Sequence, residues 1–269
     1  MPKVNANGIN IYYEIHGAGE PLVLIAGLGY SSWMWHKMVR GLAKHFQVIT
    51  FDNRGVGETD KPAGPYTAQM LADDTAGLLN ALGIPRAAIL GHSMGGFVAQ
   101  AFALTYPAMV SKLILSATNF GGPRAIPVTP EALAVLTDIK SDPIERLKRG
   151  ILISCAPGFG EAHPEIVQEW LDFRVKHPID PAAYQAQLAI GLALVSEEAC
   201  FEPKLKNITA PTLILFGEHD KVVPPGNAEL LAKQIPNSTI RILPNAGHFF
   251  PIEVPDAANE AIIQFLEMR

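Results

Sequence analysis

The segment Gly91-His92-Ser93-Met94-Gly95-Gly96 constrains the fold most strongly, because it joins two stretches of different character. Residues 86–90 before it form a short apolar run with the length of a buried strand, and residues 97–104 after it have the length and composition of a helix. The pattern predicts a sharp strand-to-helix turn with Ser93 at its apex. Gly91 and Gly95 fit this turn, because a Cβ at either position would collide with the neighbouring strand or helix.

A Gly-x-Ser-x-Gly pattern also occurs by chance in glycine-rich loops, so its place between a strand and a helix is what gives it meaning. Such a turn lifts the Ser93 hydroxyl clear of the sheet and aims the N-terminus of the following helix at it. The backbone N–H of Met94 would then face the negative charge that develops on an attacked carbonyl oxygen. The hypothesis requires an acid and a histidine later in the chain.

Apolar runs of strand length alternate with helical patterns along most of the chain. Asn7-Gly8, between two strand-like runs, predicts an antiparallel hairpin at the N-terminal edge. The alternation that follows predicts an α/β fold with a mostly parallel eight-stranded sheet and helices on both faces. Strands are expected near Val4 and over 9–15, 21–26, 46–51, 86–90, 110–117, 211–216 and 239–243, and helices over 35–45, 67–82, 97–104, 227–234 and 256–266.

The alternation stops after residue 120, and strand-like runs resume only after about residue 203. We therefore expect a core formed by residues 1–120 and 204–269, with an inserted helical cap, or lid, formed by residues 121–203. Because this insertion follows the carboxyl end of a strand, it would gate water and shape a pocket. Its helix-start signals are Asp142-Pro143, Pro164-Glu165 and Asp180-Pro181.

The 269 residues carry a formal net charge of −5, with 48% hydrophobic and 17% charged residues. This composition is typical of a globular chain with an ample core, and the lack of a basic excess argues against a nucleic-acid partner. No uninterrupted apolar run of about 18 residues occurs, so no membrane association is expected. The N-terminal residues lack an apolar signal core, which favours a cytoplasmic location. The sequence leaves the oligomeric state open.

In a parallel sheet, functional side chains gather in the loops beyond the carboxyl ends of the strands. Three such loops carry Ser93, Asp220 and His248. These residue types support nucleophilic catalysis, in which the serine attacks, the histidine moves its proton and the acid orients and stabilises the imidazolium. His248 stands alone in a glycine-containing loop after the last strand, whereas His92, beside the serine, is expected to pack. Residues 116–119, another place for the acid, contain no carboxylate.

Other carboxylates are weaker candidates than Asp220. Glu218 lies within the exit of its strand, and Asp256 has the position of a helix N-cap. Asp52 follows a neighbouring strand, but together with Arg54 it is expected to buttress the polar loop that begins there.

Two backbone N–H groups are needed to stabilise an oxyanion, and we expect them from Met94 and from Leu28, which lies in a loop of small residues after the third strand. Aromatic residues near these loops would line an apolar pocket, although each of them could equally fill the core. The expected pocket residues are Gly27, Trp33, Trp35 and Phe249.

Metal and phosphate chemistry find no support in the sequence. No His or Cys cluster has the spacing of metal ligands, and neither a P-loop motif nor a Gly-x-Gly-x-x-Gly motif opening a helix occurs. The two cysteines, Cys155 and Cys200, are expected to be buried free thiols. The expected reaction uses no metal and no cofactor.

The chain resembles the α/β-hydrolase superfamily over nearly its full length, in particular small bacterial carboxylesterases and 3-oxoadipate enol-lactonase-like enzymes. Most relatives with this pattern have His where this chain has Ala26, a departure that enzymes similar to 3-oxoadipate enol-lactonase share. A serine nucleophile in place of aspartate argues against haloalkane dehalogenases and epoxide hydrolases. The matching segments are 27–29, 52–57, 91–96, 217–220 and 247–249, and the order Ser, acid, His is that of the superfamily.

The leading hypothesis is a serine hydrolase that cleaves small carboxylic esters through an acyl-enzyme. A lactonase or a C–C bond hydrolase with the same triad is the first alternative. A basic residue facing the pocket would favour it by binding a carboxylate substrate, and Arg124 and Lys140 are candidates. A hydrolase-like binding protein with vestigial catalysis is the second alternative, and the intact set of Ser93, Asp220 and His248 argues against it.

Overall fold

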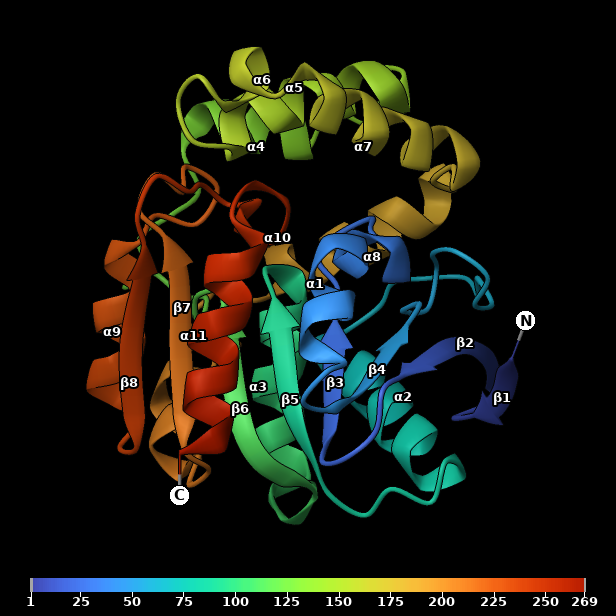
Figure 1. Ribbon diagram of the computed structural model, residues 1–269, viewed down its shortest axis with the longest axis vertical. Helices are drawn as coiled ribbons and strands as arrows, with labels where there is room; N and C mark the ends of the chain where they lie inside the picture. Colours follow the sequence, from blue (N-terminus) through green and yellow to red (C-terminus); the bar gives the residue numbers. More distant parts are fainter. Residues whose placement is uncertain (1, 269) are drawn as a thin grey trace.

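The computed structural model describes residues 2–268, in which one sheet of eight strands is flanked by helices (Figure 1). The strand order is β1-β2-β4-β3-β5-β6-β7-β8. β2 pairs antiparallel with β1 and β4, and all other pairs are parallel. The predicted α/β class is confirmed. The strands are β1 (Lys3–Ala6), β2 (Ile9–His16), β3 (Pro21–Ile25), β4 (Gln47–Phe51), β5 (Ala87–His92), β6 (Val110–Ser116), β7 (Thr212–Gly217) and β8 (Ser238–Leu243).

The predicted hairpin joins β1 to β2. Asn7 and Gly8 both have positive φ angles, 48° and 78°. This is the backbone conformation that a two-residue turn between twisted strands requires, and Asn followed by Gly adopts it at low cost. The antiparallel pairing of Ala6 with Ile9 closes the turn.

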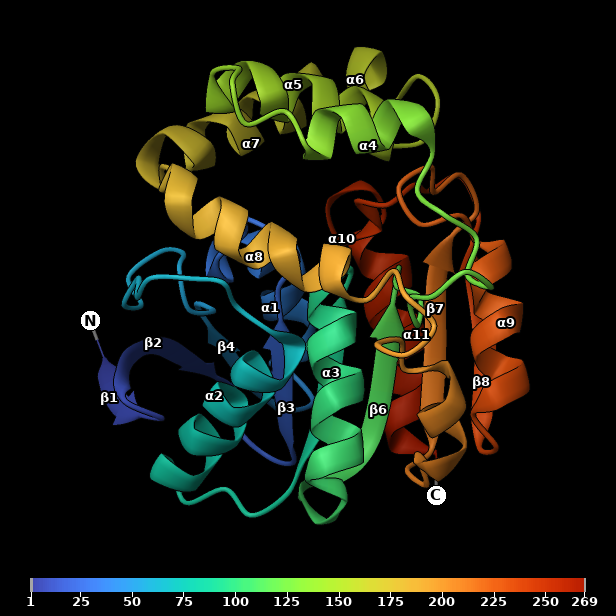
Figure 2. The same ribbon diagram turned by 180° about the vertical axis from the view of Figure 1, so that it is seen from behind.

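Helices cover both faces of the sheet, as predicted (Figures 1 and 2). The central strands β3, β5 and β7 are almost entirely buried, because each is apolar on both faces. One apolar core lies between the sheet and α2 (Ala68–Ala81), α3 (Met94–Thr105) and α9 (Gly226–Gln234). The other lies between the sheet and α1 (His36–Leu42) and α11 (Pro255–Glu267).

The stretch between β6 and β7 contains five α-helices, which we call the cap helices. Figures 1 and 2 show α4 to α7 above the carboxyl ends of the parallel strands, with α8 descending toward α3. The side chains of Asp142 and Asp180 accept hydrogen bonds at the starts of α5 and α8, as their Asp-Pro signals predict. The cap helices are α4 (Pro130–Leu136), α5 (Pro143–Ser154), α6 (Phe159–Ala162), α7 (Pro164–Lys176) and α8 (Pro181–Ala193).

Two helix starts differ from the predictions. The helix expected from residue 35 is preceded by a 3-10 turn, η1 (Ser32–Trp35), and α1 itself ends at Leu42. Asp256 is not an N-cap: it lies in the first turn of α11, because Pro255 occupies the first helical position with its fixed φ. The remaining short elements are η2 (Pro107–Met109), η3 (Glu202–Asn207) and α10 (Phe250–Glu253).

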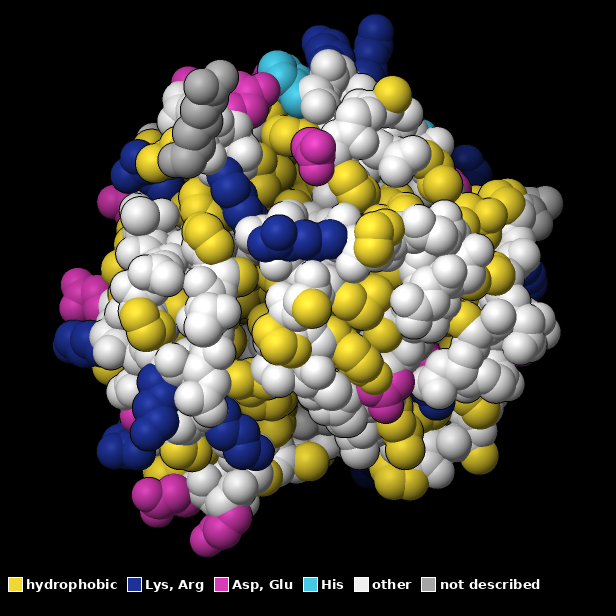
Figure 3. All heavy atoms as spheres, turned by 90° about the horizontal axis from the view of Figure 1, so that it is seen from below, with side chains coloured by type: hydrophobic (Ala, Val, Ile, Leu, Met, Phe, Trp, Pro, Cys, Tyr) yellow, Lys and Arg dark blue, Asp and Glu magenta, His cyan; other side chains and the backbone are white. Residues whose placement is uncertain are grey.

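The surface opposite the cap helices is shown in Figure 3. Lysine, arginine, aspartate, glutamate and apolar side chains are intermixed there. None of the helices in residues 2–268 combines the length and the hydropathy that a membrane span requires.

Candidate active site

Ser93 occupies the sharp turn between β5 and α3, with φ 56° and ψ −120°. A positive φ is strained for a residue with a Cβ, and two hydrogen bonds hold it: Ser93 N–H donates to Ser116 O at 2.8 Å, and Gly96 N–H donates to Ser93 O at 2.8 Å. A Cβ on Gly91 would lie 2.1 Å from Gly95 O, and one on Gly95 would lie 2.3 Å from Ile25 O. The two flanking glycines are therefore required by close backbone packing.

His248 and Asp220 follow the neighbouring strands β8 and β7, whose carboxyl ends lie at the same edge of the sheet as that of β5. His248 Nδ1 lies 2.8 Å from Asp220 Oδ2, and the two residues are only 4% and 3% exposed. The other carboxylate oxygen of Asp220 accepts hydrogen bonds from the backbone N–H groups of Val222 and Val223, at 2.9 and 2.8 Å. Hydrogen bonds to both oxygens thus hold the buried Asp220 carboxylate in place beside the His248 ring.

Ser93 and His248 line one cavity beneath the cap helices. Among the described residues no hydrogen bond joins Ser93 Oγ to His248, and such contacts are often long without substrate. The space between protein atoms amounts to about 730 Å³ including the mouth, but the centre of a water molecule can move within only about 80 Å³ of it. The cavity therefore suits a small ligand.

The loop after β3 contributes Gly27 and Leu28 to the cavity wall. Two cap helices hold this loop at Gly29, whose φ is 73°. Gly29 N–H donates to Gln187 Oε1 on α8 at 2.9 Å, and Gly29 O accepts from Arg174 Nη2 on α7 at 2.9 Å. Met94 is the first residue of α3, so its N–H has no acceptor within the helix. The position of the Leu28 loop therefore depends on the cap helices as well as on the sheet.

The expected pocket residues divide into two groups. Gly27 and Phe249 line the cavity, whereas Trp33 and Trp35 do not. Trp33 packs against the rings of α7, with its centroid 4.7 Å from that of Trp170, and Trp35 is fully buried with its ring 6.1 Å from that of His92. The expectation was wrong for both tryptophans because the turn η1 directs them into packed side chains.

His92 is buried beside the candidate residues and packs as expected. Its Nδ1 lies 2.8 Å from Ser116 Oγ, and its ring centroid lies 4.9 Å from that of His248. Burial, and to a smaller extent the neighbouring His248, lower the pKa of His92 well below its ordinary value. His92 is therefore neutral at physiological pH and adds no charge next to His248.

Asp52 buttresses its loop, as expected, but not with Arg54. Its carboxylate accepts from Ser32 N–H at 2.7 Å and from Glu58 N–H at 2.8 Å. Arg54 pairs instead with Asp74 on α2, at 2.5 Å, in a largely buried bidentate contact.

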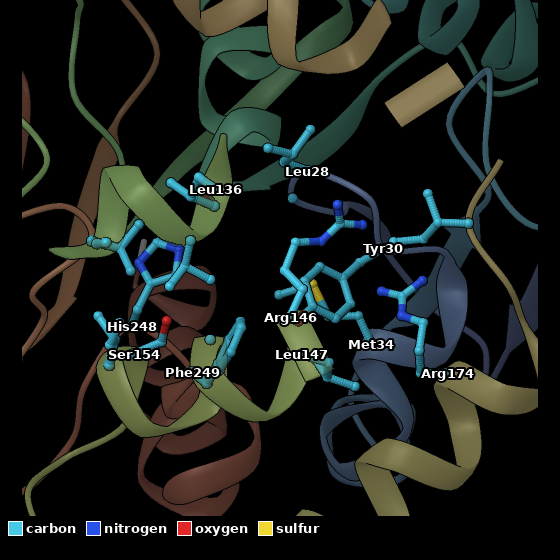
Figure 4. Close-up of a pocket in the computed structure, with 18 of the residues that line it drawn as sticks. Leu28, Tyr30, Met34, Leu136, Arg146, Leu147, Ser154, Arg174, His248 and Phe249 are labelled. Atoms are coloured by element: carbon cyan, nitrogen blue, oxygen red, sulfur yellow. The ribbon is translucent and has the colours of Figure 1, made fainter. Parts of the chain in front are cut away.

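The basic residues that face the cavity are Arg146 on α5 and Arg174 on α7 (Figure 4). Neither Arg124 nor Lys140 lines it, and Arg124 is 66% exposed in its ion pair with Glu202. Sequence reasoning missed both arginines. No sequence signal marks Arg146: its place on the inner face of α5, with Leu147 and Gly150, is known only from the cavity lining.

Metal ligands do not gather at this site or elsewhere in residues 2–268: no group of three or more His, Cys, Asp or Glu side chains could hold an ion there.

A family model described as "alpha/beta hydrolase fold" matches residues 20–255. The chain belongs to the α/β-hydrolase fold family. It is 32% identical over 263 residues to a putative non-heme bromoperoxidase, BpoC, of Mycobacterium tuberculosis, covering 96% of this chain and 97% of the relative.

A thermophilic esterase from Thermogutta terrifontis superposes with a TM-score of 0.82 at 31% identity, over 99% of this chain and 98% of the esterase. The enol-lactonase from Burkholderia xenovorans LB400 superposes with a TM-score of 0.84 at 28% identity, over 99% of this chain and 100% of the lactonase. Because these similar proteins carry different names, family membership supports a hydrolase and leaves the bond that it cleaves to be argued from the site.

Proposed function

We propose that this α/β hydrolase cleaves small carboxylic esters through a Ser93–His248–Asp220 triad and an acyl-enzyme. The observation that carries the proposal is the buried His248–Asp220 pair, at 2.8 Å, whose histidine lines the same cavity as a serine on a strained strand-to-helix turn. The similarity to an esterase of 31% identity adds support.

In the proposed reaction, Ser93 Oγ attacks the ester carbonyl while His248 Nε2 accepts its proton. Asp220 accepts from His248 Nδ1–H, which fixes the tautomer and stabilises the imidazolium. His248 then protonates the leaving alcohol. Water, activated by the same histidine, attacks the acyl-enzyme and releases the acid. The expected reaction needs no cofactor.

The proposed oxyanion hole consists of the N–H groups of Leu28 and Met94. Leu28 lines the cavity in the loop held by the cap helices, and Met94 N–H lies at the N-terminus of α3, where the helix dipole adds to the attraction for a negative oxygen. We further propose that residues 121–203 act as a cap over a core of residues 1–120 and 204–269, and that the cap excludes water from the reaction.

Lactone opening remains the second candidate, because the enol-lactonase neighbour covers the whole chain and two arginines face the cavity. The same triad would open a lactone, with the alkoxide leaving group tethered to the acyl part. Hydrolytic C–C cleavage and a binding-only role are weaker alternatives.

The first experiment is hydrolysis of p-nitrophenyl acetate, butyrate and octanoate, with one lactone in the same panel, by the wild type and by Ser93→Ala. Ser196→Ala, an exposed serine outside the cavity, is the matched control. We expect turnover of the short esters, its loss in Ser93→Ala and its retention in Ser196→Ala.

Each other outcome points elsewhere. Rapid lactone opening with slow ester turnover would make the protein a lactonase. Fluorophosphonate labelling of Ser93 without turnover would keep the triad and reject the substrate class. Wild-type activity in Ser93→Ala would reject the nucleophile, and no labelling at all would favour a binding protein.

A further inference from the structure

Two guanidinium groups face the candidate active-site cavity from different cap helices. Figure 4 shows Arg146 and Arg174 on the side of the cavity opposite to His248. Neither takes part in any ion pair between described residues. Arg54 and Arg149, by contrast, each pair with an aspartate. The cavity therefore contains positive charge that the described chain does not neutralise.

Arg174 is only 4% exposed, an unusual burial for an arginine without a carboxylate partner. Its Nη2 donates to Gly29 O at 2.9 Å and its Nη1 donates to His177 O at 3.3 Å. The guanidinium also lies 5.1 Å from the ring centre of Tyr30. Its buried Nε–H has no acceptor among the described residues. One donor of this buried cation thus has no partner among the described residues.

Arg146 is half-buried, and its guanidinium lies 4.2 Å from the ring centre of Tyr184, which also lines the cavity. Its Nη1 donates to Asp138 O at 2.9 Å. The carboxylate of Asp138 binds Arg149 and Ser141 instead. The two guanidinium groups lie on the same side of the cavity and repel each other: burial, and the positive charge of Arg146, lower the pKa of Arg174. A bound anion would relieve this repulsion and offset the desolvation of Arg174.

We propose that the natural substrate carries a free carboxylate, which binds to Arg146 and Arg174 while its ester or lactone carbonyl lies at Ser93. This inference rests on the proposed function. The planar carboxylate matches the guanidinium edge and can accept from both arginines with charge-assisted hydrogen bonds. The small volume open to water limits the length of the substrate chain between its carboxylate and its ester or lactone carbonyl. The substrate class is therefore a half-ester of a short dicarboxylic acid, or a lactone with a short carboxylate arm.

The test compares two ethyl esters of equal size, monoethyl glutarate and its amide analogue, in which a carboxamide replaces the free carboxylate. Ethanol release gives kcat and KM for each ester. We expect the wild type to prefer the anionic ester by about 10- to 100-fold in kcat/KM, the range of a charge-assisted hydrogen bond between buried partners.

Arg146→Gln should reduce this preference by about tenfold, chiefly through a higher KM for the anionic ester. Lys148→Gln is the matched control: it lies on α5, removes the same charge, is exposed and pairs only with Glu145. It should keep the wild-type preference. Arg174→Lys keeps the charge but loses the planar fork, and it should lower the preference without abolishing it.

Equal kcat/KM for the two esters in the wild type would overturn this inference but not the proposed function. An unchanged preference in Arg146→Gln would do the same. Absence of turnover of both esters, together with no fluorophosphonate labelling of Ser93, would overturn the proposed function and this inference with it.

Discussion

Glu253, at the end of α10, joins a cap helix to the loop that carries His248. Its carboxylate accepts from Ala156 N–H, just after α5, at 2.6 Å, and from Gly247 N–H at 3.0 and 3.1 Å. Burial raises the pKa of Glu253 to about 7 from 4.5, and the two N–H donors oppose this effect only in part. Between pH 4.5 and about 7, the folded protein therefore keeps Glu253 protonated, whereas the unfolded chain has already released this proton.

The magnitude follows from the size of the shift. A rise of the pKa from 4.5 to about 7, at about 1.36 kcal/mol for each unit, corresponds to about 3 kcal/mol. Because the folded state holds the proton more tightly, the contribution of Glu253 to the free energy of unfolding is largest below the unfolded pKa. It decreases as the pH rises through the window between 4.5 and about 7, and it changes no further above.

The substitution Glu253→Gln removes this titration while keeping one acceptor for the two N–H groups. We expect the free energy of unfolding of the wild type, relative to the variant, to fall by about 3 kcal/mol from about pH 4.5 to about pH 8. Urea unfolding followed by tryptophan fluorescence at several pH values measures it. Glu260→Gln, at an exposed glutamate on α11, is the control for removing one carboxylate. A pH-independent difference for Glu253→Gln would refute the reasoning.

Three further substitutions test the site and its scaffold. Asp220→Asn should lower kcat for ester hydrolysis by about 10⁴-fold with the fold retained, because the histidine loses the acceptor that fixes its tautomer; activity within tenfold of the wild type would point to another acid. Arg54→Gln leaves the buried Asp74 carboxylate without a cation, which should lower the free energy of unfolding in urea by about 3–5 kcal/mol; a loss below about 1 kcal/mol would mean that the pair contributes no more than a solvent-exposed ion pair. Gly95→Ala places a Cβ 2.3 Å from a backbone oxygen of β3 and should abolish folding, whereas Gly160→Ala, whose nearest neighbour would be 3.5 Å away, should be tolerated; circular dichroism of both variants checks this.

Local signals were sufficient to predict the sheet and the positions of the three candidate catalytic residues. The first four residues of β5, 87–90, are apolar and buried, and the Asn7-Gly8 turn needs only two residues to specify a hairpin. Because parallel strands end at one edge, the order of strands alone brings the loops of Asp220 and His248 together. The strand, the turn and the strand-end loops are each specified by residues that are close together in the sequence.

Side-chain partners between distant elements were not predictable in this way. Arg54 was expected to support Asp52, two residues away, but it reaches α2 to pair with Asp74. Likewise, which basic residue faces the cavity depends on how α5 and α7 are oriented above the strand ends. A helical pattern shows which residues share a face but not which part of the protein that face contacts. For this reason Arg146 and Arg174 became visible only in the folded chain.

Hydrogen bonds connect the cap helices to the loops that carry Gly29 and His248. His248 N–H donates to Ser154 O, the last residue of α5, at 2.5 Å, and Gly29 is held between α7 and α8. Arg174 both holds the Gly29 loop and lines the cavity. Its Nη2 donates to Gly29 O, and its Nε–H has no acceptor among the described residues. A carboxylate bound to the Arg174 guanidinium would immobilise the same side chain that positions the proposed oxyanion loop. Substrate charge and the geometry of the oxyanion hole would then be coupled, so that loss of the carboxylate would reduce kcat as well as raise KM.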